Sequence, residues 1–349
     1  MVFPALTLGS PAPARPDYDT SSNHDRSRSE MGGKFWYWGG HSDLASNVEK
    51  LLPGRRVMTA AVGPFSSAWD RACELYAQIK GGLVHYGAVH AARHGHAKYG
   101  RESQGLYPEW DRDHPIHLIG HSFGGTTARV LVQLLSDGGA SMGEDDHVFG
   151  GGTSAEWILS VTTIATPHDG TPMITLLDTW MGAIFNSLGM AAGVAGVSDS
   201  SGAVYDFKLE QWGVAARDKS EPWGAYTARV RAAPLWKDHE RNRDLIHHDL
   251  SPEGAAEVNS WVQDSPLVLY VSYETLSSSP DPFSSIGNEI PHLSTNPMFV
   301  ASGVILGRVD QCGNARRPTM SREWRRNDGM VSCRSPFHAL ERRCPCPVS

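Results

Sequence analysis

The residues best suited to chemistry lie in Gly120-His121-Ser122-Phe123-Gly124-Gly125, which matches the pattern G-x-S-x-G. A nucleophilic serine needs a tight turn from a strand into a helix, because that turn exposes its hydroxyl and admits only small flanking residues. The backbone N–H of Phe123 would then face the oxyanion of an acyl-transfer intermediate, with help from the helix dipole. The motif predicts a nucleophile at Ser122. The alternative, in a chain with 36 glycines, is an ordinary turn between a strand and a helix.

A serine nucleophile on this kind of fold is followed along the chain first by an acid and then by a histidine. Asp328, in the turn Asn327-Asp328-Gly329, is the candidate acid that would orient and stabilise an imidazolium. The alternative is a simple Asp-Gly turn. His338 is the one histidine that follows Asp328, so it is a candidate general base. Its setting, SPFHALERRCPCPVS, also fits an exposed histidine in an irregular tail.

A second group of residues has the donor types of a zinc site. Asp70 lies early in an expected helix, His90 and His96 lie in HAARHGHAKYGR, and Asp249 precedes another helix. Two imidazoles and two carboxylates can close a tetrahedral site, and four protein ligands would make the Zn²⁺ structural. The alternative is a solvated loop. Other histidines could also compete as ligands: His85, His94, His247 and His248.

Strands and helices alternate along the chain in a way that would position these residues. Apolar runs predict strands at 56–62, 115–120, 157–165 and 267–274. Helical spacing and capping residues predict helices at 67–80, 124–135 and 252–262, and an apolar helical face from Met173 to Leu188. Such alternation favours an α/β fold, a mostly parallel sheet with helices on both faces.

Composition narrows the classes of partner. The chain has 349 residues, 40% of them hydrophobic, and a net charge of −7, so it has a sizeable core and no basic excess for nucleic acid. The longest apolar stretch, 173–197, contains Asp178 and Asn186, which argues against a stable membrane span. Residues 1–34 are rich in Pro, Ser, Asp and Arg, so we expect disorder there and see no signal peptide. The five cysteines form no disulfide pattern and are expected to be free thiols.

Several longer motifs resemble one known family. They occur in this order: VGPFSSAWDRACELYAQIKGG, HAARHGHAKYGR, IHLIGHSFGG, SVTTIATPHDGT, VYDFKLEQWGV, HDLS and NDGMV. From about Phe35 to Val331 the chain is similar to the zinc-containing lipases of thermophilic bacilli and their staphylococcal relatives. The resemblance implies an α/β-hydrolase domain over 35–335, with a zinc-binding insertion at about 64–110, a helical lid at about 171–235 and an irregular tail at 336–349.

The resemblance also implies the roles of single residues. It places the nucleophile on Ser122, the acid on Asp328 and one zinc ion on Asp70, His90, His96 and Asp249. It further implies a lipid ester substrate, met at a lipid–water interface. The family is generally secreted, so secretion is suspected, although the sequence itself leaves the location open.

Two departures from the family bear on activity. Residues 1–34 lack a His-Gly-Phe-x-Gly turn, whose Phe gives a second oxyanion N–H, and the segment after Asp328 lacks the family's His-Leu motif. The calcium ligands near that motif are missing too, so we expect no calcium site. We therefore expect a serine hydrolase that cleaves lipid carboxylic esters through an acyl-enzyme on Ser122. The alternative is an impaired or inactive truncated homologue that retains the zinc-binding scaffold.

Overall fold

A computed structural model describes the backbone of residues 5–9 and residues 44–174, 208–215, 218, 220–233, 235, 242–295, 297–308 and 322–333. The predicted base His338, most of the predicted lid (175–207) and the predicted tail lie outside these ranges.

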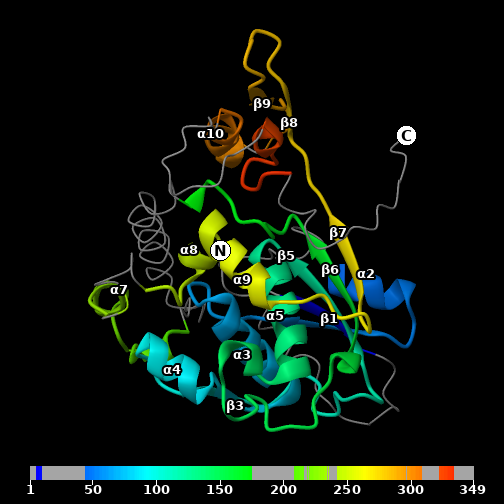
Figure 1. Ribbon diagram of the computed structural model, residues 1–349, viewed down its shortest axis with the longest axis vertical. Coiled ribbons are helices and arrows are strands. Elements are labelled where there is room, and N and C mark those ends of the chain that lie inside the picture. The colour runs from blue at the N-terminus through cyan, green and yellow to red at the C-terminus, as the bar shows by residue number, and fades with distance from the viewer. Residues whose placement is uncertain are drawn as a thin grey trace.

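A five-stranded sheet in the order β2-β1-β5-β6-β7 forms the centre of the molecule (Figure 1). Its strands are β1 (Ala5–Gly9), β2 (Arg56–Ala60), β5 (Ile116–His121), β6 (Ile158–Ile164) and β7 (Leu269–Tyr273). β5, β6 and β7 are parallel, as the sequence predicts. The α/β class with a parallel sheet is thereby confirmed.

Strand β1 lies in the segment that we expected to be disordered, and that expectation is wrong for residues 5–9. β1 runs antiparallel to both of its neighbours, with Gly9 opposite Ile116 and Ala5 opposite Gly120. The slot between β2 and β5 explains the strand, because both neighbours present backbone N–H and C=O groups that need partners. An apolar run such as ALTLG can fill the slot in either direction.

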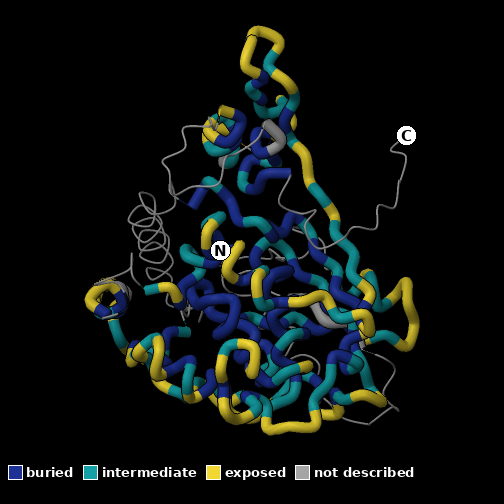
Figure 2. Tube along the Cα trace, viewed as in Figure 1, coloured by how far each residue is buried: buried dark blue, intermediate teal, exposed yellow. Residues whose placement is uncertain are grey.

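Two long helices pack on the sheet and on each other. They are α3 (Ala68–Lys80) and α5 (Phe123–Asp137), and α5 lies against β5 and β6. Ser67 caps α3 by accepting a hydrogen bond from the N–H of Asp70 at 3.1 Å. α5 is buried over most of its length and ends at Gly138, whose φ of 66° suits glycine. Both helices belong to the main hydrophobic core, seen in dark blue in Figure 2.

The remaining elements connect or cover this core. The other helices are α2 (Leu44–Leu51), α4 (Ala88–His94), α7 (Trp223–Arg231), α8 (Ile246–Asp249), α9 (Pro252–Trp261) and α10 (Pro297–Leu306). Short 3-10 helices span Ala140–Met142, Ala155–Trp157, Glu210–Trp212 and Arg322–Arg325. Two small sheets pair β3 (Gly82–His85) with β4 (Tyr99–Ser103), and β8 (Ser278–Pro280) with β9 (Glu289–Pro291). β8, β9 and α10 form the upper end of the molecule in Figure 1. Within the described ranges, no helix is long and apolar enough to cross a membrane.

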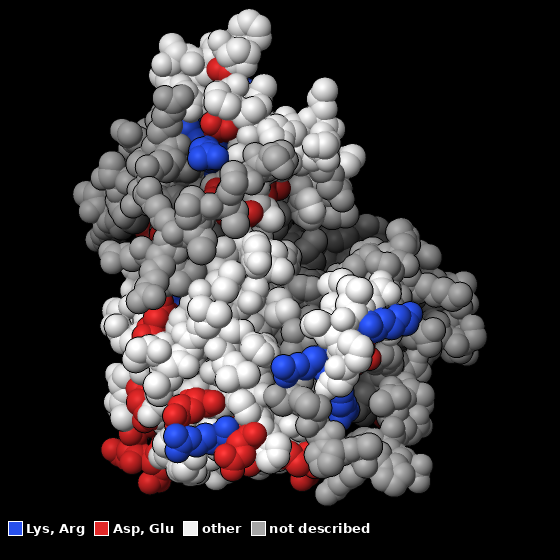
Figure 3. All heavy atoms as spheres, turned by 90° about the vertical axis from the view of Figure 1, so that its right-hand side faces the viewer, with Lys and Arg blue, Asp and Glu red and all other residues white. Residues whose placement is uncertain are grey.

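The outer edge of the sheet is apolar. β7 carries no charged residue, and Leu269 and Tyr273 are 65% and 59% exposed on it. The face in Figure 3, on the side where β7 lies in Figure 1, has an uncharged middle, with most charged side chains towards its lower end. Edge strands are usually protected by charged side chains, and β7 itself carries none.

The core also encloses a thiol. Cys73, on α3, is 1% exposed and is a free cysteine, as is the buried Cys333. Burial raises the pKa of the Cys73 thiol well above its usual range, and the nearby carboxylates add to this. Both thiols are free, as expected from the sequence.

Close packing at the end of β5 gives a first prediction. A Cβ on Gly120 would lie 2.4 Å from the backbone carbon of Gly124, where no side chain can move aside. We expect Gly120→Ala to lower the free energy of unfolding by about 1–3 kcal/mol, the usual cost of overpacking. Urea denaturation measures this cost.

Gly224→Ala is the matched control, because nothing lies within 4 Å of its Cβ position on helix α7. It should be neutral or stabilising by up to about 1 kcal/mol, as is usual for Gly→Ala in a helix. Equal effects of the two substitutions would show that the contact at Gly120 is not as tight as described.

Candidate active site and metal centre

Ser122 sits where β5 turns into α5, in a backbone conformation that non-glycine residues rarely adopt. Its φ is 53° and its ψ is −131°. Within the described ranges only two other non-glycine residues, Ala165 and Lys208, have a positive φ. Such a conformation costs about 1–3 kcal/mol and persists only where the surroundings enforce it. The N–H of Ser122 donates to the carbonyl of Ile164 at 2.8 Å, which ties the turn to β6.

The residue after the serine is placed to offer its backbone. Phe123 is the first residue of α5 and its side chain is fully buried. The first N–H groups of a helix have no partner within the helix, so they can face a developing negative charge. The local geometry therefore matches the strand–serine–helix turn that the sequence predicts.

Asp328 lies in a turn at the same edge of the sheet. Its Oδ1 accepts hydrogen bonds from the N–H groups of Met330 and Val331 at 2.9 and 2.7 Å, and its Oδ2 accepts one from the hydroxyl of Thr275. The carbonyl of Met330 accepts a hydrogen bond from Thr171, which comes shortly after β6. These contacts hold the Asp328 turn at the carboxyl end of the parallel strands.

The charge of Asp328 affects the pKa of His121, the residue before Ser122. Burial lowers the pKa of His121, and the negative charge of Asp328 acts in the opposite direction. Asp328 therefore lies within electrostatic range of the residue that precedes Ser122. The structure thus brings the two predicted residues to one region, and Asp328 also forms the Asp-Gly turn that was the alternative interpretation.

A second group of four side chains converges at one point. Asp70, His90, His96 and Asp244 each direct one possible ligand atom to a region in which these atoms all lie within 4.8 Å of one another. His90 Nε2 is 3.2 Å from Asp70 Oδ1 and 3.1 Å from Asp244 Oδ1. His96 Nε2 is 3.1 Å from Asp244 Oδ2 and 3.8 Å from Asp70 Oδ1. Ligands about 2.0–2.1 Å from a tetrahedral Zn²⁺ stand about 3.3 Å apart, so the spacing fits such an ion.

The hydrogen bonding of the group also fits a metal. Five of its buried atoms have no hydrogen-bond partner: Asp70 Oδ1, His90 Nε2, His96 Nε2, Asp244 Oδ1 and Asp244 Oδ2. Unpaired polar atoms are costly in a protein interior, and a cation that bound one atom of each residue would satisfy four of the five. His96 Nδ1 lies 2.9 Å from the carbonyl oxygen of Ala97, which places the proton there and frees Nε2 as a ligand.

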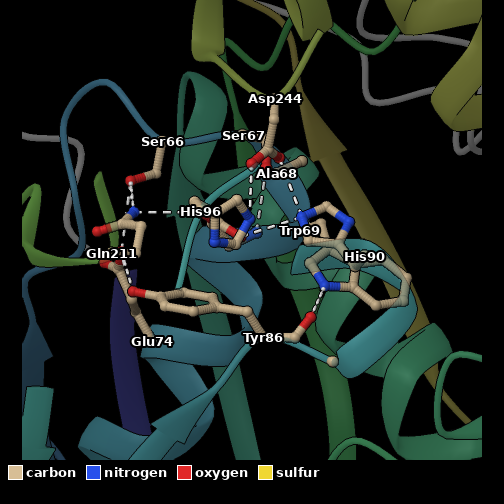
Figure 4. A network of polar contacts seen from close by, with 12 residues as sticks. Ser66, Ser67, Ala68, Trp69, Glu74, Tyr86, His90, His96, Gln211 and Asp244 are labelled. Atoms are coloured by element: carbon tan, nitrogen blue, oxygen red, sulfur yellow. Dashed lines mark hydrogen bonds and ion pairs between the residues drawn. The ribbon is translucent and has the colours of Figure 1, made fainter. Parts of the chain in front are cut away.

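Neighbouring residues hold these ligands in place. Figure 4 shows His90 and His96 turned towards Asp244, with Trp69 beside His90. The Trp69 and His90 rings stack, with centroids 4.8 Å apart and an angle of 11° between the planes. Gln211 donates a hydrogen bond to Asp70 Oδ2 at 3.1 Å. Glu144 accepts the N–H groups of the first turn of α4, including that of His90 at 2.6 Å, which anchors the helix.

The electrostatics of the group point the same way. Burial alone would lower the pKa of His90, but the close contacts with the carboxylates of Asp244 and Asp70 raise it to about 10. Burial would raise the pKa of Asp244, but His90 and His96 hold it well below its usual range. Asp244 therefore favours positive charge beside it, whereas burial and the charge of Asp244 raise the pKa of Asp70, and a cation between the two carboxylates would relieve both effects.

The sequence-based ligand set is wrong at one position. Asp249 does not join the group. Its Oδ2 accepts the N–H of Ala68 at 2.7 Å, at the start of α3, and Asp244 takes the place that Asp249 was expected to fill. Leu245 pairs with Ser66 in an isolated β-bridge, which brings its neighbour Asp244 beside α3. Asp244 and Asp249 are five residues apart, so both lie near the start of α3. The pairing of Leu245 with Ser66 is what places Asp244, rather than Asp249, in the group.

The fold and the serine turn together define a lipase-like α/β protein. The family described as "Lipase-like, C-terminal domain" matches residues 31–344, and the chain belongs to this family. The chain is 34% identical to a lipase of Staphylococcus epidermidis over 316 residues, 88% of this chain and 42% of the relative. It is 32% identical to lipase 1 of Staphylococcus aureus strain Mu50 over 314 residues, again 42% of the relative. The chain thus spans less than half the length of these curated relatives.

Solved structures show the same similarity. EstA from Clostridium botulinum superposes with a TM-score of 0.75 at 38% identity, over 88% of this chain and 70% of that one. Lipase 1 from Pelosinus fermentans gives 0.69 at 37% identity, over 86% and 78%. The resemblance drawn from the sequence motifs is confirmed.

The assignment of the fourth ligand can be tested directly. Asp244→Asn should lose the metal, because loss of a ligand costs more than the roughly 10- to 100-fold in affinity typical of outer-shell changes. Asp249→Asn should keep it, because its side chain contacts the backbone of α3. After exchange into Zn²⁺ buffer and gel filtration, elemental analysis reports the metal per chain. A full complement in Asp244→Asn, or loss in Asp249→Asn, would reverse the assignment.

Asp249 also gives a prediction about pH. Burial raises its pKa to about 8, against 3.8 for an ordinary aspartate. The folded protein therefore binds this proton more tightly than the unfolded chain does, and the resulting stability is lost as the pH rises from about 4 towards 8. Asn cannot ionise and keeps an oxygen for Ala68. The free energy of unfolding of Asp249→Asn relative to wild type should rise by roughly 1 kcal/mol per pH unit between about pH 5 and 7.

Urea unfolding of metal-free samples at several pH values measures this difference. Parallel stability curves for the two proteins would show that Asp249 ionises normally in the fold.

Proposed function

We propose that this protein is a serine hydrolase that cleaves carboxylic esters of lipids through an acyl-enzyme on Ser122. The observation that carries the proposal is the backbone of Ser122, strained to a φ of 53° at the junction of β5 and α5. Backbone strain of this kind clusters at functional sites, and a serine nucleophile at a strand-to-helix turn adopts it. The similarity to lipases of Staphylococcus epidermidis and Pelosinus fermentans supports the ester substrate.

The reaction would follow the usual course of serine hydrolases. The Oγ of Ser122 attacks the ester carbonyl carbon while its proton passes to a general base, and the N–H of Phe123 stabilises the oxyanion. The intermediate then expels the alcohol, which takes up the proton, and leaves an acyl group on Ser122 that water removes. Asp328 would orient the base and stabilise its positive charge. His338 remains the hypothesis for that base.

The metal in this proposal is a structural Zn²⁺ held by Asp70, His90, His96 and Asp244. Four protein ligands complete a tetrahedral shell, so when bound the ion supplies a cross-link rather than reaction chemistry. The cross-link would join α3, the segment around α4 and the segment just before α8. The four ligands lie on the side of α3 that faces α4 and α8. A bound ion would therefore hold α4 and α8 against α3.

One observation favours the alternative of an impaired homologue with an intact scaffold. β1 runs antiparallel to β5, so its end at Gly9 pairs with Ile116, at the opposite end of β5 from Ser122. β1 therefore ends away from Ser122 and does not lead towards the place of a second oxyanion N–H beside the serine. Loss of one such donor costs about 10²- to 10³-fold in rate in other serine hydrolases. We accordingly expect weak rather than full activity.

The proposal is tested by Ser122→Ala. Hydrolysis of short- and long-chain p-nitrophenyl esters by wild type should exceed that of Ser122→Ala by about 10³-fold or more if the serine is the nucleophile. Ser260→Ala, an exposed serine on α9, is the matched control and should equal wild type. A fluorophosphonate probe should label wild type at Ser122 and leave the Ala variant unlabelled. Hydrolysis no faster in wild type than in Ser122→Ala would leave the inactive scaffold as the function.

A further inference from the structure

Arg71 is a charged side chain in an unexpected place. It lies on α3, next to the candidate metal ligand Asp70, and is 0% exposed. Its Nη1 donates to the carbonyl of Gly63 at 2.7 Å, and its Nε donates to the hydroxyl of Thr127 at 3.0 Å. Removal of a guanidinium from water is costly, and a well-packed apolar side chain often stabilises a core at least as well. Its presence therefore calls for a role that an apolar residue could not fill.

The contacts of Arg71 lead to the serine turn. Thr127 lies one helical turn after Phe123, and its hydroxyl donates to the carbonyl of Phe123 at 3.0 Å. A hydroxyl has a single proton, so the Thr127 oxygen is left to accept from Arg71, and the chain of bonds has a fixed direction. The guanidinium carbon also stands 5.1 Å from the centre of the Phe123 ring, within the range of a cation–π contact. Arg71 therefore holds Phe123 by its carbonyl and by its ring.

We propose that Arg71 is a positioning residue for the serine turn: from α3 it fixes Phe123, through Thr127 and through the aromatic ring, so that the N–H of Phe123 faces the reacting carbonyl. This inference rests on the proposed function, because it assigns a purpose to that N–H. Hydrogen-bond donors to an oxyanion act only if they are held in place before the reaction, and a shift of about 1 Å can cost 10²-fold in rate.

The location of Arg71 on α3 adds a second consequence. Successive residues of a helix point about 100° apart, so Asp70 and Arg71 serve two different sides of α3. Asp70 faces the metal group and Arg71 faces α5 and the serine turn. One rigid, buried helix thus links the two sites, and the metal-holding end of α3 sets the position from which Arg71 reaches Phe123.

The first test compares Arg71→Met, Arg71→Lys and wild type with a soluble short-chain p-nitrophenyl ester. Rates are expressed per active site titrated with a fluorophosphonate, so that unfolded protein does not count. Arg71→Met should lower kcat by about 10- to 100-fold with KM within about twofold, because the loss affects the transition state rather than binding. Arg71→Lys keeps the charge but cannot make both hydrogen bonds, so it should recover part of kcat.

Two further variants make the outcome specific. Arg112→Met removes an exposed arginine that pairs with Glu156, and it should behave as wild type. Thr127→Val breaks the path to the Phe123 carbonyl while Arg71 stays in place, so it should also lower kcat, and the double variant with Arg71→Met should be no slower than the slower single variant. If Arg71→Met does not fold, Thr127→Val decides: a wild-type kcat per titrated site would overturn the proposal.

A crystal structure of Arg71→Met separates this proposal from the proposed function. The backbone nitrogen of Phe123 should move by about 0.5 Å or more relative to β5, since productive sites tolerate no larger error. If wild type proves inactive and unlabelled, the proposed function fails, and the position of Phe123 still tests Arg71. An unmoved Phe123 nitrogen in Arg71→Met would show that Arg71 only fills space in the core.

Discussion

The need to satisfy charged groups inside a buried helix governs the architecture of this protein. α3 lies in the core along most of its length, yet it carries Asp70, Arg71 and Glu74. Each would cost several kcal/mol without partners. Asp70 lies beside the two histidines and accepts a hydrogen bond from Gln211, Arg71 donates to Gly63 and Thr127, and Glu74 accepts the N–H of Gly63. These partners come from separate parts of the chain, so the demands of one helix fix the metal group, the loop after β2 and the serine turn together.

The same constraint explains why distant sequence returns to the start of α3. The first N–H groups of a helix have no internal partner. Ser67 and Asp249 supply oxygens to Asp70 and Ala68, the second of these across 181 residues. The segment before α9 is thereby held against α3, and Asp244 comes with it. The metal group and the cap of the helix are thus two results of one tertiary contact.

The features predicted correctly from the sequence are those that depend on residues close together in the chain. The strand, the serine and the helix of residues 115–135 form one continuous motif, and Asp70, His90 and His96 lie within thirty residues of one another. The choice between Asp244 and Asp249 required knowledge of which residue pairs with Ser66, and no spacing rule contains that. β1 was not predicted because it forms by pairing with β2 and β5, which are distant in the sequence. An arginine on an amphipathic helix is normally exposed to solvent. The burial of Arg71 follows from the packing of α5 against α3, which the local sequence does not reveal.

Burial of Cys73 within α3 has a practical consequence. Its thiol is screened from water and resists ionisation, so it should be inert towards alkylating reagents while the helix stays docked. The rate at which Cys73 is alkylated, measured by peptide mass spectrometry, therefore gives the frequency with which α3 leaves the core. The rate of this modification therefore reports on the opening of the helix that joins the metal group to the serine turn, and no probe residue has to be introduced.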